Sequence, residues 1–195
     1  GTSGTWTQSG QLVLTAASEG TAGTACEVTF TLMNPDVAQA SPAVSVSAAI
    51  QDGSGNSVGS IASAEMVKPG GALFGVANGA DPLLVVVPIF GVKSIQQSTP
   101  VPGATNKLTV SLTANFNLAA GSKVTITGLT GSQTADSASL TVSSTSDLWG
   151  TSGTWTQSGQ LVLTAASGGT AAGTESKVTF ALTNAAEAQS SPSVS

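Results

Sequence analysis

Acid–base chemistry needs titratable side chains that lie close together, and this chain has few of them. It has 195 residues and contains no histidine, arginine or tyrosine. Without histidine, neither a Ser–His nor a Cys–His arrangement can form, and the commonest base near neutral pH is missing. Paired carboxylates are the remaining possibility for acid–base chemistry, but aspartates in turn-like segments usually bond their own backbone. All five aspartates lie in such segments, namely Asp36, Asp52, Asp81, Asp136 and Asp147. We therefore expect no enzyme and no cofactor.

Metal binding has one candidate, the segment from Asp52 to Asn56. Its alternating oxygen-bearing side chains resemble the start of a calcium loop, but the twelfth position, where that loop needs a bidentate glutamate, is Ser63. A Gly/Ser turn is the better interpretation, and no metal site is predicted. The single cysteine, Cys26, is replaced by Ser176 in the repeat described below. This exchange favours a packed small side chain over a nucleophile or half of a disulfide.

The charge of the chain argues against nucleic acid and membranes as partners. Only 8% of the residues are charged, the net charge is -5, and the five lysines form no basic run. Such a surface cannot neutralise phosphates or hold an anionic bilayer. The longest apolar stretch, residues 82–90, is too short to cross a bilayer as a helix. Neither nucleic acid as a partner nor a membrane-spanning segment is therefore expected.

Apolar and polar residues alternate with a period of two through most of the chain, which is typical of strands with one buried face. The pattern predicts strands at residues 11–16, 27–34, 43–50, 58–67, 106–116, 123–129 and 138–142. Helical periodicity is nearly absent, and Gly, Thr, Ser and Val are poor or middling helix formers. The predicted fold is all-β, an antiparallel sandwich of immunoglobulin-like character with about eight or nine strands per unit. The sequence pattern does not distinguish this sandwich from a barrel.

Residues 83–90 are apolar on both faces and contain Pro88. Continuous burial indicates a strand covered on both sides, whereas proline belongs at an edge or a bulge because it cannot donate to the ladder. An apolar edge is a surface that a neighbouring module can cover. Leu84, Val86 and Phe90 are therefore candidate assembly contacts.

A long internal repeat organises the chain. Residues 1–45, the first copy, return as residues 150–195, the second copy, with 34 of 45 aligned positions identical and one inserted alanine at Ala172. The matched pairs include Val28/Val178, Phe30/Phe180 and Asn34/Asn184. A repeat this close is typical of tandem arrays in which neighbours complete each other. It predicts one complete unit at residues 1–149 and the first strands of a second unit at 150–195.

Three tryptophans are associated with the repeat. Trp6 matches Trp155, and Trp149 directly precedes the second copy. Each can bury on the order of 150 to 250 Å². Packing at the junction between units is the favoured interpretation, and a platform that binds sugar is the alternative.

Covalently attached sugar is a separate question. No asparagine has a hydroxyl residue two places further on, so N-linked glycans are excluded. Ser or Thr beside proline is associated with O-glycosylated stalks. The candidate O-glycosylation region comprises Ser41, Pro42, Thr99, Pro100, Pro102, Ser191 and Pro192.

The motifs GTWTQSGQLVLTAASGGTAAGT, VTFALTN and LAAGSKVTITGLTGSQTADSASLTV resemble long tandem-repeat proteins of microalgae and other protists that are predicted to be secreted. The resemblance covers the whole chain, but its motifs are strand and turn patterns without chemistry. It implies an extracellular, fibrous structural protein. No functional residues are carried over with it.

The second copy is too short to fold alone. Ordering about 45 residues costs on the order of 70 kcal/mol at roughly 1.5 kcal/mol each, more than a few leucines and a phenylalanine return. Either the second copy docks on another subunit, or residues 46–195 form the true domain and residues 1–45 complete a predecessor. Both arrangements predict a homopolymer, an extracellular filament or surface layer built by head-to-tail strand complementation. The alternative function is an adhesive or carbohydrate-binding module on a cell-surface stalk.

Overall fold

The computed structural model describes residues 4–18, 20–145 and 148–195, so that the predicted turn residue Asp147 lies outside the described residues. The chain divides into two compact units, Gly1–Met33 and Asn34–Ser195. Within the described ranges there are eleven strands in three antiparallel sheets and no α-helix. The prediction of an all-β, antiparallel protein is therefore confirmed.

The unit Gly1–Met33 contains one hairpin. Its strands are β1 (Gly4–Thr7) and β2 (Gln11–Leu14), with Trp6 opposite Leu12. The described residues that follow β2 in this unit form no further strand. The strand predicted at residues 27–34 is therefore absent from the first copy, although its repeat in the second copy forms β11.

A second hairpin opens the unit Asn34–Ser195. It joins β3 (Ser45–Gln51) to β4 (Ser57–Glu65), close to the predicted strands at 43–50 and 58–67. The turn between them contains Asp52, whose Oδ1 accepts hydrogen bonds from the backbone N–H groups of Ser54 at 2.9 Å and Asn56 at 2.8 Å. The segment that resembled a calcium loop is thus a side-chain-stabilised hairpin turn.

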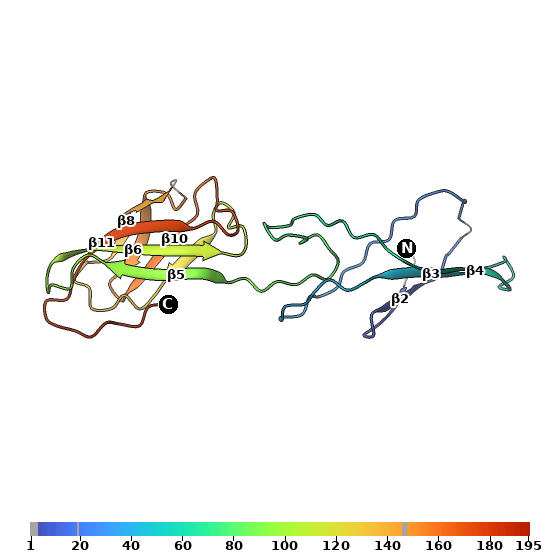
Figure 1. Cartoon of the computed structure of the whole chain (residues 1–195), viewed down its shortest axis with the longest axis horizontal. Coiled ribbons are helices and arrows are strands. Elements are labelled where there is room, and N and C mark those ends of the chain that lie inside the picture. The colour runs from blue at the N-terminus through green and yellow to red at the C-terminus, as the bar shows by residue number, and fades with distance from the viewer. Residues whose placement is uncertain (1–3, 19, 146–147) are drawn as a thin grey trace. The chain divides into compact units, whose positions relative to one another are not determined.

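The largest sheet has seven strands in the order β5-β6-β11-β8-β9-β10-β7. Figure 1 shows β5, β6 and β11 side by side. The strands are β5 (Phe90–Gln97), β6 (Thr105–Ala114), β7 (Lys123–Ile126), β8 (Ser137–Ser144), β9 (Ser152–Thr156), β10 (Gln160–Thr164) and β11 (Ser176–Thr183). The unit boundary expected at residue 149 therefore runs through this sheet, which combines β5–β8 with three strands of the second copy.

The seven-stranded sheet curls at β8. One end of β8 pairs with β11 through Val142 and Ser144, and the other pairs with β9 through Ser137 and Leu140, with an irregularity between the last two residues. Because β8 links the two halves, their apolar faces form one buried cluster. Its members include Leu108, Val110, Leu112, Val124, Ile126, Val142, Trp149, Trp155, Leu161, Leu163, Val178 and Phe180.

The segment 83–90 does not form the predicted strand. Its only pairing is an isolated bridge between Val85 and Gln39, and regular pairing begins at Phe90, where β5 starts. Pro88 lies in the intervening stretch and has no N–H to donate to a ladder. The strand β5 beyond it was not predicted from the sequence, because FGVKSIQQ alternates weakly.

Candidate assembly interface

The second copy forms much of the interior of the seven-stranded sheet. The relative exposure of Trp155 is 1%, that of Val178 is 0% and that of Phe180 is 3%. In the register between β11 and β6, Val178 lies opposite Val110 and Phe180 lies opposite Leu108. The apolar residues of β11 alternate with polar ones, as the pattern at the equivalent residues 27–34 predicts. Strands from residues 90–144 thus surround those of the second copy.

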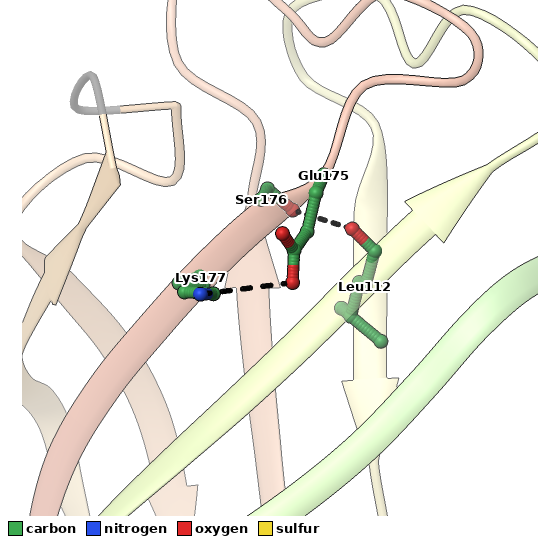
Figure 2. Close-up of polar contacts among 4 residues, drawn as sticks. All are labelled: Leu112, Glu175, Ser176 and Lys177. Atoms are coloured by element: carbon green, nitrogen blue, oxygen red, sulfur yellow. Dashed lines mark hydrogen bonds and ion pairs between the residues drawn. The ribbon is translucent and has the colours of Figure 1, made fainter.

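Polar contacts join the second copy to the rest of the sheet. The Trp149 Nε1–H donates to Ser176 Oγ at 3.2 Å, and that hydroxyl donates to the Leu112 carbonyl at 3.4 Å. Figure 2 shows the Ser176 and Leu112 groups directed toward each other, beside the exposed pair formed by Glu175 and Lys177, whose N···O distance is 3.9 Å. Such an exposed ion pair contributes little. The buried hydroxyl therefore matters more than the charges next to it.

A pair of amide side chains, buried Asn106 and half-buried Asn184, anchors the end of β11. Asn106 is 3% exposed, and its Nδ2 donates to Asn184 Oδ1 at 2.8 Å and to Gln97 Oε1 at 2.9 Å. Asn184 Nδ2 donates in turn to the carbonyls of Thr99 at 3.1 Å and Val101 at 2.8 Å. Sequence reasoning missed this network. The identity of Asn34 and Asn184 in the repeat was the signal that could have indicated it.

The same residues are exposed in the first copy. Trp6 is 43% exposed where Trp155 is 1%, Val28 is 49% where Val178 is 0%, and Phe30 is 55% where Phe180 is 3%. Cys26 is a free, exposed thiol at the position of the buried Ser176. The same apolar side chains are therefore exposed in one copy and packed in the other.

The remaining predicted assembly contacts lie elsewhere in the unit Asn34–Ser195. Leu84 and Val86 are half-buried and line a cavity of about 200 Å³ with Leu73 and Phe116. Phe90 packs against the buried cluster at the start of β5. The structure thus brings Trp149, Trp155 and Phe90 to one core and places Leu84 and Val86 at a separate cavity.

A larger cavity of about 360 Å³ lies beside the Asn106–Asn184 pair. Its lining includes Leu108, Leu182 and Gln189 and, among the described residues, contains no charged side chain. Acid–base chemistry has no titratable group to use in this cavity. Nor does the described part of the chain hold any cluster of three or more His, Cys, Asp or Glu side chains.

The predicted O-glycosylation residues differ in accessibility. Ser41 is half-buried and its hydroxyl donates to the Pro82 carbonyl at 2.7 Å. The half-buried Thr99 accepts from the Val101 N–H at 3.2 Å. Ser191 is exposed, as are Pro42, Pro100 and Pro102, while Pro192 is half-buried. Ser191 is thus the most accessible of the three candidate hydroxyls.

Comparisons with protein-family models, curated proteins and solved structures return no match for this chain. In the described residues, no helix has the length and apolar character needed to cross a membrane.

Proposed function

We propose that this protein is a structural, non-enzymatic subunit of an extracellular filament or surface layer. Its immunoglobulin-like units join head to tail through β-strand complementation. The observation that supports this proposal is the contrast between the copies, since the same apolar side chains are buried in residues 150–195 and exposed in residues 1–45. A function as a repeating scaffold explains why one sequence occurs in both settings.

The partner of the first copy is a segment with the sequence of residues 90–149 from another copy of the unit. In the second copy, β11 lies between β6 and β8. Through the repeat, Val28 and Phe30 take the places of Val178 and Phe180 against a second β6. Strand addition of this kind combines backbone hydrogen bonds with pockets for alternate side chains.

Burial of the exposed set favours this association. Complete burial of a Val, Leu or Phe side chain is worth about 1.5 to 3 kcal/mol, and the half-exposed residues of the first copy gain part of this. The backbone of the described residues between 25 and 33 forms no sheet pairing, so strand addition also satisfies its polar groups. Side-chain burial and backbone hydrogen bonding therefore both favour association, and both act on the same segment of the first copy.

The geometry of the contact leads to a polymer. The donor surface is residues 4–33 and the acceptor surface is residues 90–149, so the interface is heterologous. A heterologous contact repeated along a chain of units extends as a filament unless its rotation closes a ring. No cofactor or nucleic acid takes part in this assembly.

The surface chemistry suits an extracellular setting with O-linked glycans. Ser, Thr, Gly and Ala replace most charged residues, and Ser191-Pro192 is an accessible Ser–Pro pair. A native protein mass equal to that of the bare sequence would remove the glycan part of the proposal. The scaffold function would remain.

The test is to complete the first copy in cis. A copy of residues 90–149 is added before Gly1 of the full chain, which recreates the junction found between Trp149 and Gly150. Cys26 then takes the buried position of Ser176, and its reaction with a maleimide is expected to slow at least about tenfold, as local opening becomes rarer. Longer arrays should appear in electron micrographs as filaments with a regular axial repeat.

The matched control carries Val110→Asp and Leu112→Asp in the added segment only. These changes place charge in the core that the added strands should form, so Cys26 should react as fast as in the original chain. Equal Cys26 reactivity with the native and the altered extension would contradict the proposal. So would isolated globular particles in micrographs of the array.

A further inference from the structure

The strand β7 forms one edge of the seven-stranded sheet. Thr127, the residue directly after β7, begins another pairing. The Thr127 N–H donates to the Ser195 carbonyl at 2.7 Å, and the Ser195 N–H donates to the Thr127 carbonyl at 3.0 Å. The two hydroxyls lie 2.8 Å apart. Reciprocal bonds between two residues define a hydrogen-bonded pair of antiparallel strands. Ser195 is therefore placed as the first residue of a further antiparallel strand.

The outer edge of β7, meaning the side away from β10, extends this pairing. Along a strand, successive residues direct their N–H and C=O groups to opposite sides. Since Thr127 directs its groups to Ser195, Thr125 and Lys123 direct theirs to the same side. Among the described strands, β7 pairs only with β10. Two further residues of the edge are thus set to continue the ladder.

The repeat indicates which sequence follows at this point. Ser195 aligns with Ser45, and Ser45 is the first residue of β3. At the two ends of β3, the Val44 carbonyl accepts from the Met66 N–H at 2.8 Å, and the Asp52 N–H donates to the Asn56 carbonyl at 2.9 Å. Both contacts are on the β4 side of the hairpin, so the even-numbered residues of β3 direct their backbone N–H and C=O groups to β4.

The backbone N–H and C=O groups of the odd-numbered residues of β3 are consequently directed away from β4. These residues begin with Ser45, Ser47 and Ala49, and no described strand pairs with them on that side. Ser45 is the residue whose repeat, Ser195, already bonds Thr127. On β3 and on the outer edge of β7, the residues whose backbone groups could bond each other therefore recur at every second position.

The register implied by the Thr127–Ser195 pair also matches the apolar pattern. Continued in antiparallel order, it places Val46 opposite Ile126, and Ala48 opposite Val124. Ile126 and Val124 are buried, and directly opposed residues direct their side chains to the same face. Ser47 then lies opposite the exposed Thr125. A shift by one residue would reverse both faces, so hydrogen bonding and burial select the same register.

We propose that the outer edge of β7 binds a second copy of the β3–β4 hairpin, which begins at Ser195 as β3 begins at Ser45, and that this extends the sheet by two strands. The inference rests on the proposed function, because it requires one unit to follow another. In such an array, β3 and β4 of this chain would pair with the β7 edge of the preceding repeat. Each junction would then contain an uninterrupted sheet, and β7 would no longer be an exposed edge.

The test uses the full chain with residues 46–65 added after Ser195. Site-resolved amide hydrogen exchange is measured by NMR at low protein concentration. In the original chain, the Lys123 and Thr125 amides should exchange faster than those of Val124 and Ile126, which bond β10. The extension should slow the Lys123 and Thr125 amides by at least about tenfold.

The matched control carries Ser47→Pro in the added segment only. Proline removes the N–H that would bond the Thr125 carbonyl, while position 47 makes no bond to β4, so the added hairpin keeps its own pairing. Slower exchange with the native extension but not with the proline variant supports the inference. Unchanged Lys123 and Thr125 exchange with the native extension overturns it. Cys26 protection is measured on a different surface, so failure of the proposed function is recognised independently.

Discussion

The two copies of the repeat have nearly the same sequence and different structures. In residues 150–195 the copy forms β9, β10 and β11 within the seven-stranded sheet, whereas in residues 1–45 it forms the hairpin β1–β2 and the start of β3. Trp155 is packed in the core and Trp6 is half-exposed. Since the local sequence is shared, the difference comes from the neighbours. Residues 90–144 surround the second copy, and the first copy has no equivalent partner among the described residues.

This contrast shows that strand propensity alone does not form a sheet. The residues Val28, Phe30 and Leu32 have the period-two pattern of a strand, but they lie in irregular structure in the first copy. Their repeats, Val178, Phe180 and Leu182, are all buried in β11. A strand becomes stable when its backbone groups are paired and one face is covered.

The largest effect is expected from the tryptophan pair. Trp155→Ala should lower the free energy of unfolding of the seven-stranded sheet by about 3 to 5 kcal/mol, because it empties a core site. Trp6→Ala should change it by less than about 0.5 kcal/mol, as surface substitutions do. Urea unfolding, followed by the fluorescence of the buried Trp149, measures both values.

Trp155→Phe gives a milder version of the same comparison, in case the alanine variant does not fold. It keeps an aromatic ring but loses the bond from Trp155 Nε1 to the Thr134 carbonyl, which is 3.1 Å long. Equal destabilisation by changes at Trp6 and Trp155 would contradict the contrast between the copies.

The asparagine pair should give an intermediate effect. Asn184→Ala should cost about 1 to 3 kcal/mol, because buried Asn106 loses an acceptor and two backbone carbonyls lose their donor. Asn34→Ala alters an exposed side chain and should stay within about 0.5 kcal/mol. Urea midpoints of the two variants provide the measurement. If both shift equally, the network does not distinguish the copies.

The smallest effect is expected at Asp52, in the turn of the exposed β3–β4 hairpin. Hydrogen bonds from the side chain and backbone of Asn56 hold the pKa of Asp52 below its ordinary value. A lowered pKa in the folded state stabilises the hairpin above the unfolded pKa, and this contribution is lost as the pH falls from about 4 through the lowered value. The hairpin should therefore loosen in acid while the core of the seven-stranded sheet is unaffected.

An NMR titration of the Asp52 carboxyl, together with the amides of Ser54 and Asn56, measures this effect. In Asp52→Ala, both amides should lose their low-pH transition. An Asp52 carboxyl that titrates at its ordinary pKa would show that the turn bonds do not stabilise the hairpin.

Strands with strong local alternation were predictable. The segments predicted at 106–116, 123–129 and 138–142 correspond to β6, β7 and β8, because apolar residues at every second position imply one buried face wherever the strand pairs. Short or weakly alternating strands were missed, namely β1, β9 and β5. The four residues of β1, GTWT, contain one large apolar side chain, which is too little for a periodic signal.

The candidate interface was predictable only in part. The repeat indicated Trp6, Trp149 and Trp155 as residues at a junction, and the structure places the latter two in the core. The Asn106–Asn184 bond joins residues 78 positions apart, and no local pattern specifies such a pair. The bond between Thr127 and Ser195 spans 68 positions and was missed for the same reason.

The sequence by itself determined the all-β class, the alternating faces of the strands and the presence of two copies of one segment, because these depend on the order of neighbouring residues. Only the tertiary structure decided that residues 150–195 share a core with residues 90–144, while their repeats at residues 4–33 stay solvated. Pairing across many residues depends on which strands are present to bond the backbone and cover the apolar face. Nearly identical sequences therefore have different structures when one has its partner strands and the other does not.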